Sequence, residues 1–205
     1  MTRNQSLTVK TLHTVLKINI RCLELGWFHE ISFVNDTEAE RTEMLNKKLR
    51  DCDKYLWLDY SISMDHASIE QIFKCTNTVI FPCVVPVVDW GLFKHKVLEN
   101  TDEPVSQVGL QFDTEVTKPT KDLVGHYNVK KTVPSCFMLD QKDVSRVLKQ
   151  KNGPSLKLSG NTEKLFETLL GKNVKMTAFV DAEIGKTATH ECHGHILYAA
   201  GIKSV

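Results

Sequence analysis

Apolar and polar positions alternate along the chain with the periods of helices and strands. From residue 6 to residue 25 the apolar side chains recur every three or four residues, which predicts an amphipathic helix that Gly26 ends. Those apolar residues are Leu12, Val15, Leu16, Ile20 and Leu23. A short strand is expected at 30–34, and a charged helix follows from about residue 38 to residue 50, with Met44, Leu45 and Leu49 on its buried side.

The middle of the chain predicts a strand, a helix and a second strand. Residues 55–58 read YLWL, an apolar run of β-forming residues that fits a strand buried on both faces, with Asp59 at its carboxyl end. Asp65 can cap a helix over 66–74, and a strand is expected over 78–85. This order is typical of a parallel sheet.

Proline and glycine residues interrupt the pattern between residues 89 and 128. This region is interpreted as an irregular insertion with one strand, at 105–112. Beyond it we expect a strand or hairpin over 129–139, a helix from Asp140 to about 149, a loop over 151–160, a helix from Asn161 to Gly171, and a strand over 174–180. The expected fold is one α/β domain, residues 1–205, with a layered, mostly parallel sheet flanked by helices.

The amino-acid composition limits which classes of binding partner are expected for the chain. The chain has 26 Lys and Arg against 25 Asp and Glu, a net charge of +1, so no global field draws it to nucleic acid or anionic lipid. No run approaches the ~20 apolar residues of a membrane span, and the N-terminus does not resemble a signal peptide, so a cytoplasmic location is expected. The six scattered cysteines are expected to be reduced and mostly buried.

Three ordered blocks carry a resemblance to a known family. They are LWLDYSI at 56–62 with VIFPC at 79–83, then VPSCFML at 133–139, and then Asn161-Thr162-Glu163 with FVD at 179–181 and IGKTATH at 184–190. Together they resemble nucleotide-sugar-dependent glycosyltransferases of the A-type fold (GT-A), particularly minimal viral, phage and bacterial members. The resemblance covers roughly residues 30–195 and rests on the order of the blocks.

The resemblance implies a nucleotide-sugar donor, a glycan or protein acceptor and a Mn²⁺ or Mg²⁺ ion. Asp59 would contact the ribose or the metal, His190 would complete the metal shell, and Glu163 would orient or deprotonate the acceptor hydroxyl. Arg41 would bind the diphosphate, and Trp90 would stack on a sugar ring.

Several positions depart from the family pattern. Ser61 occupies the second position of the Asp-x-Asp motif, where a carboxylate would hold the metal, and Lys164 follows Glu163 where a second acid is common. The chain also begins almost directly with a helix, which leaves two interpretations of the family's opening strand and donor pocket: other residues replace that strand, or the chain is a fragment or a degenerate relative with an incomplete pocket.

These departures leave other interpretations open. The chain could be a catalytically inactive relative that serves as a binding module, or a zinc-binding module centred on HECHGH at 190–195. The single residues also have structural alternatives: Asp59 as a capping acid, Glu163 as an acid stabilised by a helix dipole, Arg41 as a solvated ion-pair partner, and Trp90 as a loop anchor.

Overall fold

A computed structural model shows how these elements pack, and it describes residues 8–35, 37–99, 108–121, 123–148 and 157–186. The helices are α1 (Val9–Glu24), α2 (Glu38–Lys48), α3 (His66–Lys74), α4 (Trp90–Leu98), α5 (Gln141–Leu148) and α6 (Thr162–Gly171). The strands are β1 (Lys54–Leu58), β2 (Ile62–Met64), β3 (Thr78–Ile80), β4 (Val84–Val88), β5 (Leu110–Phe112), β6 (Thr114–Pro119), β7 (His126–Thr132), β8 (Cys136–Asp140), β9 (Met176–Phe179) and β10 (Ile184–Lys186).

The main sheet has six strands in the order β1-β8-β3-β9-β7-β6. Of its five neighbouring pairs only β3 and β9 are parallel, so the expectation of a mostly parallel sheet is wrong. The α/β class is confirmed, but the sheet is mixed. The physical reason is that β8 returns antiparallel between β1 and β3, and the β6–β7 hairpin adds two further antiparallel pairs.

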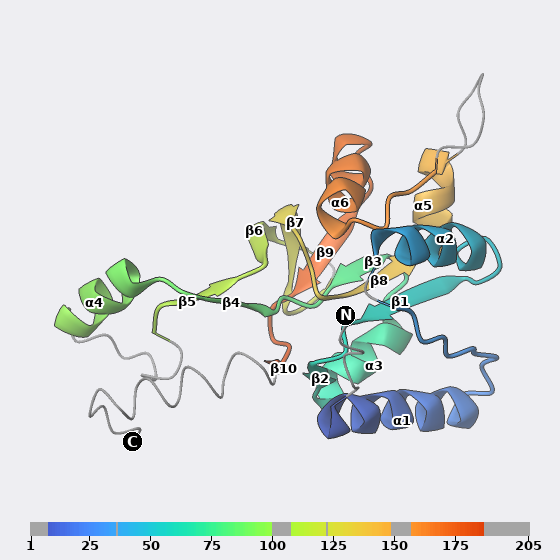
Figure 1. The fold of residues 1–205 in the computed structure, drawn as a ribbon, viewed down its shortest axis with the longest axis horizontal. Coiled ribbons are helices and arrows are strands. Elements are labelled where there is room, and N and C mark those ends of the chain that lie inside the picture. The colour runs from blue at the N-terminus through green and yellow to red at the C-terminus, as the bar shows by residue number, and fades with distance from the viewer. Residues whose placement is uncertain (1–7, 36, 100–107, 122, 149–156, 187–205) are drawn as a thin grey trace.

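Helices cover both faces of this sheet (Figure 1). On one face α2, α5 and α6 bury a core that includes Leu45, Val144 and Phe166 against β8 and β9. On the other face α3 and β2 bury Ile69 and Ile62 against β3 and β8. The strand β8 contributes to both cores, and all five of its residues are buried.

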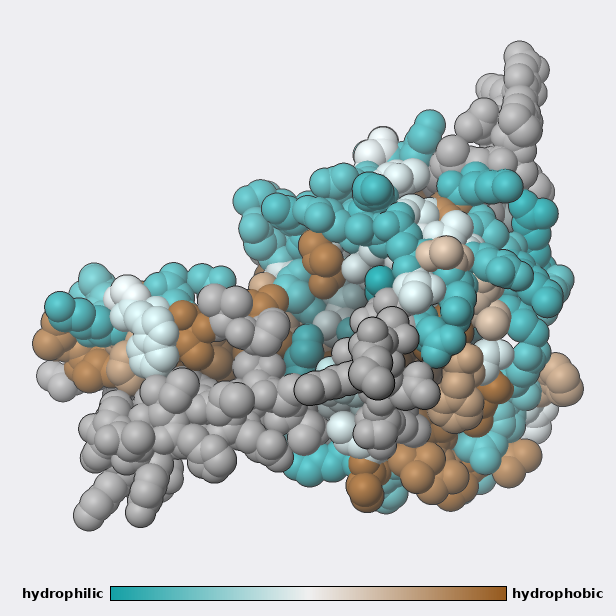
Figure 2. Space-filling view, in the orientation of Figure 1, coloured by the Kyte–Doolittle hydropathy of each residue, from teal (hydrophilic) through white to brown (hydrophobic). Residues whose placement is uncertain are grey.

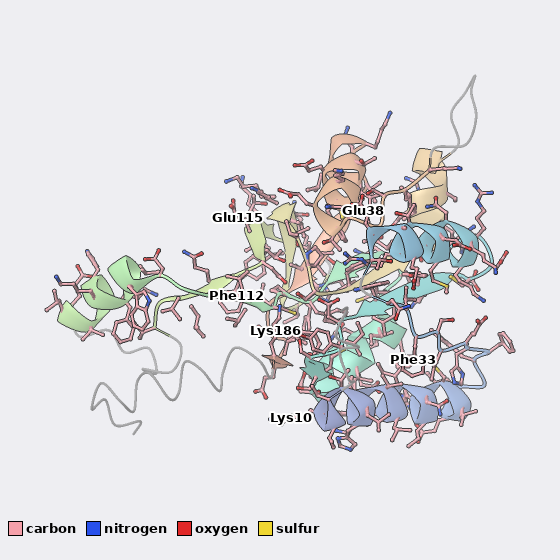
Figure 3. The ribbon with its side chains drawn as sticks, viewed as in Figure 1. Lys10, Phe33, Glu38, Phe112, Glu115 and Lys186 are labelled. Atoms are coloured by element: carbon pink, nitrogen blue, oxygen red, sulfur yellow. The ribbon has the colours of Figure 1, made fainter. Side chains whose placement is uncertain are left out.

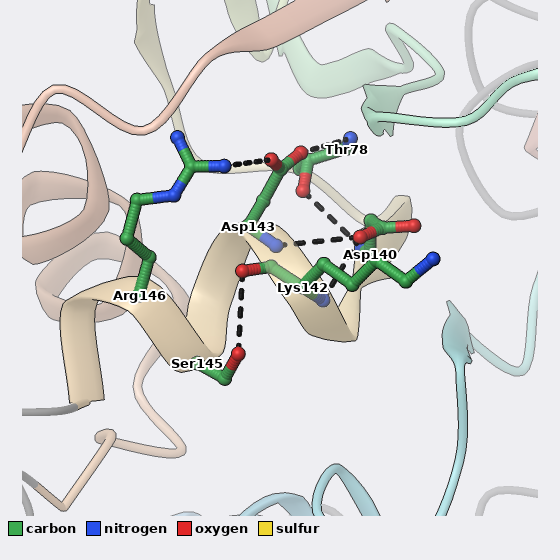
Figure 4. A network of polar contacts seen from close by, with 6 residues as sticks. All are labelled: Thr78, Asp140, Lys142, Asp143, Ser145 and Arg146. Atoms are coloured by element: carbon green, nitrogen blue, oxygen red, sulfur yellow. Dashed lines mark hydrogen bonds and ion pairs between the residues drawn. The ribbon is translucent and has the colours of Figure 1, made fainter.

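The helix ends follow the capping signals of the sequence. Thr8, Thr37, Asp65 and Asn161 each accept a hydrogen bond from a backbone N–H in the first turn of α1, α2, α3 and α6 respectively. The carboxylate of Asp140 likewise accepts from the N–H groups of Lys142 and Asp143 at the start of α5, as expected (Figure 4).

Some expected elements differ from the structure. Residues 30–34 form no strand, because no strand of the described chain pairs with them. The strand expected to be buried on both faces, β1, is half-buried, because it lies at the edge of the sheet. The strand expected over 78–85 is divided into β3 and β4, and β4 belongs to a separate pair with β5.

The region expected to be an irregular insertion is more regular than the sequence indicated. It contains α4, β5, β6 and the start of β7. The arm formed by β4, β5 and α4 extends away from the main sheet (Figure 1). At the end of the arm next to α4, Gly109 has φ +78°, and an added Cβ would lie 2.8 Å from Cβ of Phe93, so glycine suits this close approach. Across the described residues, no helix is both long and apolar enough to cross a membrane.

We expect that the free energy of unfolding depends strongly on the packing of α6 against β8. Phe166 is fully buried and packs edge-to-face on Phe137, with ring centroids 4.9 Å apart. The substitution Phe166→Ala should lower the free energy of unfolding by about 3–5 kcal/mol in a urea titration followed by circular dichroism. Phe28→Ala is the matched control, because Phe28 is 99% exposed, and it should change that free energy by less than about 0.5 kcal/mol. Equal effects would contradict the packing described here.

Candidate functional site

The carboxyl ends of β1, β3 and β9 lie at one edge of the main sheet. The strands β1 and β3 run in the same direction because both are antiparallel to β8, and β9 is parallel to β3. The same edge contains the start of β8, where Ser135 precedes Cys136. In open α/β sheets ligands bind outside the carboxyl ends of the strands, so polar and charged side chains at this edge are candidates for a binding site.

Asp59 is held in place at the end of β1 by three hydrogen bonds. Its backbone N–H donates to the carbonyl of Ser135 at 3.1 Å, and its carbonyl accepts from the N–H of Ile62 at 3.1 Å. The indole Nε1 of Trp57 donates to Oδ1 of Asp59 at 2.8 Å. The carboxylate is therefore oriented beside the face of the sheet that α2 and α6 cover.

Arg41 approaches the same indole from α2. It lines a small pocket together with Tyr55, Trp57 and Thr162, and the pocket has a volume of about 10 Å³. That is the space of about one water molecule, well below the volume of a nucleotide site. The structure thus brings Arg41 and Asp59 to the same tryptophan, but the pocket between α2 and α6 is not large enough for a donor nucleotide.

Gly160 permits the close approach of the α6 N-terminus to α2. A Cβ at this position would lie 2.4 Å from the backbone nitrogen of Thr42 and 2.6 Å from the carbonyl oxygen of Glu38. The N–H of Gly160 also donates to Oγ1 of Thr42 at 2.7 Å. A side chain here would force α2 and α6 apart and so disturb the Arg41 side of the site.

Lys186 approaches the other side of the β1 tip. It lies opposite Ile62 in the β10–β2 pair, and its Nζ donates to Oγ of Ser135 at 3.0 Å (Figure 3). The carbonyl of Ser135 also accepts from the N–H of Asp59. The ammonium group of Lys186 and the backbone of Asp59 therefore both contact Ser135. Lys186 was not among the expected site residues, because it reaches this place through a strand pairing across more than a hundred residues, and no local motif marks it.

Asp113 is a second carboxylate that sequence reasoning missed. Its Oδ1 accepts from the N–H of Cys83 at 3.0 Å and from Oγ1 of Thr114 at 2.9 Å, and its Oδ2 accepts from the N–H of Ser135 at 3.1 Å. Burial nevertheless raises the pKa of Asp113, and these hydrogen bonds oppose the rise. Asp113 therefore joins the loop after β3 to the loop before β8.

The two thiols at this edge are buried and unreactive. Cys83 and Cys136 are 1% and 0% exposed, and burial raises the pKa of both, with Asp113 and Asp59 adding to the rise. Lys186 opposes the shift at Cys83. Thiols held neutral in this way are poor nucleophiles and poor metal ligands, which agrees with the expectation of buried, reduced cysteines.

The other expected site residues are distributed differently. Ser61 is 3% exposed in the turn between β1 and β2, next to Asp59. Glu163 is exposed in the first turn of α6, adjacent to the pocket-lining Thr162. Trp90 is half-exposed on α4, packed on Phe93 with ring centroids 5.7 Å apart, at the far end of the arm from β1 (Figure 1). His190, and with it the cluster at 190–195, lies outside the described residues.

The described residues do not by themselves provide a metal site. Within the placed parts of the chain, no group of three or more His, Cys, Asp or Glu side chains is arranged to hold a metal ion. Ser61, at the second position of the Asp-x-Asp pattern, offers a hydroxyl, which is a weak ligand for Mn²⁺ or Mg²⁺ compared with a carboxylate.

Comparison of the sequence with known proteins does not assign the chain to a family. No protein-family model matches the chain, and no curated protein sequence matches it.

We expect Asp113 to be required for the shape of this edge. In Asp113→Asn, one side-chain NH₂ would face a backbone N–H donor, at Cys83 or at Ser135, in place of an acceptor oxygen. Because hydrogen bonds to a charged acceptor contribute about 1.5–3 kcal/mol, the free energy of unfolding should fall by about 2 kcal/mol in a urea titration.

The matched control is Asp51→Asn, at an exposed position before β1, which should change the free energy of unfolding by less than about 0.5 kcal/mol. An Asp113→Asn protein as stable as its parent would show that these hydrogen bonds do not hold the two loops together.

Proposed function

We propose that the chain is a glycosyltransferase-like protein that binds a nucleotide-sugar donor at the carboxyl end of β1. The observation that carries the proposal is the position of Asp59: it follows a strand at the ligand-binding edge of the sheet, and Trp57 orients its carboxylate. Two cations each share a neighbour with this residue: Arg41 lines the pocket beside Trp57, and Lys186 donates to Ser135, whose carbonyl accepts the Asp59 N–H.

These groups suit the chemistry of sugar transfer. When the bond from the anomeric carbon to the diphosphate breaks, negative charge develops on the leaving phosphates, and placed cations stabilise it. Arg41 can bind a phosphate in a bidentate manner, whereas Lys186 acts as a compact point charge. The Asp59 carboxylate accepts hydrogen bonds from ribose or sugar hydroxyls, and Glu163 remains the proposed group that orients or deprotonates the acceptor hydroxyl.

A catalytically inactive binding module is the second candidate. Two observations favour it: Ser61 is buried where the family pattern has a metal-binding acid, and the pocket beside Arg41 has a volume of only about 10 Å³. Under this proposal the fold recognises a ligand or partner at the same edge without turnover.

Titration calorimetry tests donor binding directly. The natural protein is titrated with UDP- and GDP-sugars, with and without Mn²⁺, and we expect at least one donor to bind. Asp59→Asn should weaken that binding by about 10- to 100-fold, the loss of one or two charge-assisted hydrogen bonds. Asp51→Asn carries the same chemical change at an exposed position before the same strand and should bind as the parent does. If no donor binds, or if Asp59→Asn binds unchanged, the proposed donor site is wrong.

Turnover separates the two candidates. Release of free nucleoside diphosphate is followed by chromatography for the natural protein, Asp59→Asn and Ser61→Asp. Turnover by the natural protein that Asp59→Asn abolishes supports the transferase. Metal-dependent hydrolysis that appears only in Ser61→Asp supports an inactive relative.

A further inference from the structure

Helix α1 contacts the rest of the protein through a side that contains both polar and apolar residues. Oγ1 of Thr11 donates to the carbonyl of Tyr60 at 2.7 Å, and Oγ1 of Thr14 accepts from the N–H of Met64 at 3.0 Å. Both threonines are almost fully buried, at 1% and 2% exposure. The helix is thus attached by hydroxyl groups to the turn and strand that follow Asp59. On the same side Cys22 is buried and Ile18 packs against the core between α3 and β2.

The opposite side of α1 is apolar and faces outward. Four of the five residues in the three- and four-residue pattern of the sequence, together with one preceding residue, are exposed by 44% to 83%, whereas Val15 is only partly exposed. We call this set the α1 stripe: Val9, Leu12, Leu16, Ile20 and Leu23. Their spacing places them on one side of the helix, and hydrophobic side chains gather along the lower edge of the molecule where α1 lies (Figures 1 and 2).

Aromatic residues lie just beyond the C-terminal end of the α1 stripe. Phe28 is 99% exposed and Trp27 is 40% exposed, with Trp27 packed on Phe73 at 5.1 Å between ring centroids. Aromatic side chains of this kind are favoured at the boundary between water and lipid headgroups.

Basic groups border the α1 stripe. Lys10, His13 and Lys17 are exposed and follow one another at three- and four-residue intervals along one flank. The acid of the helix, Glu24, is paired with Arg21 at 3.0 Å. The chain as a whole is almost neutral, so this positive charge is a local property of α1.

We propose that α1 is an amphipathic surface helix that binds an anionic lipid membrane. A convex, single-helix stripe with aromatic residues at one end and lysines on its flank fits a flat lipid surface, into which the apolar side chains insert while the lysines contact acidic headgroups. The 16-residue helix is about 24 Å long, so it lies in the membrane plane and does not span it. The contact between Thr11 and Tyr60 then places the turn with Asp59 and Ser61 next to the lipid surface. This proposal does not depend on the sugar-transfer activity.

Vesicle flotation tests the proposal with the full chain. Vesicles of phosphatidylcholine alone are compared with vesicles that also contain phosphatidylserine. We expect the natural protein to float with the anionic vesicles, and higher salt should weaken this binding. The double variant Leu16→Glu with Ile20→Glu should reduce the bound fraction at least about tenfold, and Lys10→Glu with Lys17→Glu should also reduce it by about tenfold.

The matched control places two glutamates on another exposed helix. Val97 and Leu98 on α4 are 44% and 72% exposed, so Val97→Glu with Leu98→Glu should leave binding unchanged. Circular dichroism melting checks that each variant folds. The proposal is overturned if the natural protein does not float with anionic vesicles, if it binds neutral vesicles equally well, or if the α4 variant loses binding to the same extent. It is also overturned if light scattering shows a dimer that the α1 variant dissociates while no form binds lipid.

Discussion

The central constraint in this structure is the antiparallel insertion of β8 between β1 and β3. All five residues of β8 are buried, and its two faces belong to the two cores of the protein. Because β8 runs opposite to both neighbours, it begins where they end, so Ser135 accepts the N–H of Asp59 after β1, and Cys136 accepts the N–H of Phe81 after β3. The opposite end of β8 places Asp140 at the start of α5, where it caps that helix.

This arrangement makes Ser135 the junction of the candidate site. Its carbonyl accepts from Asp59, its backbone N–H donates to the buried Asp113, and its hydroxyl accepts from Lys186. Four segments that are distant in the sequence therefore meet at one residue. In this network each polar group has a hydrogen-bond partner, so the side chains are held in fixed positions. A binding site requires such fixed positions, and an isolated acid on the surface does not have them.

Local chemistry explains which parts of the fold could be predicted from the sequence. The helix starts followed from capping residues such as Asp65 and Asn161, whose side chains act within three residues. Strand direction was missed because it depends on pairings such as Trp57 with Phe137, which no short window contains. Asp113 and Lys186 were not predicted as site residues for the same reason, because their contacts also join segments that no short window contains. The strand expected at 30–34 did not form, since β propensity requires a partner strand.

The outward apolar side of α1 shows a second limit of pattern reading. The period of the pattern correctly indicated a helix, but it could not show which side of the helix would face the protein. Thr11 and Thr14 are buried because their hydroxyls satisfy polar groups of the β1–β2 turn and of β2. Ile18 packs inward on the same side, whereas Leu12, Leu16, Ile20 and Leu23 remain exposed. The period of the pattern thus indicates that a helix has an apolar side and a more polar side. Which of the two sides is buried depends on the contacts with neighbouring segments.

Hydrogen–deuterium exchange, measured with and without a bound UDP- or GDP-sugar, tests most directly whether the ends of β1, β8 and β10 form one binding site. The account predicts ligand-dependent protection of the three segments 58–62, 135–137 and 184–186 together, because they meet around Ser135. Protection confined to another part of the molecule, such as α4 on its arm, would contradict it.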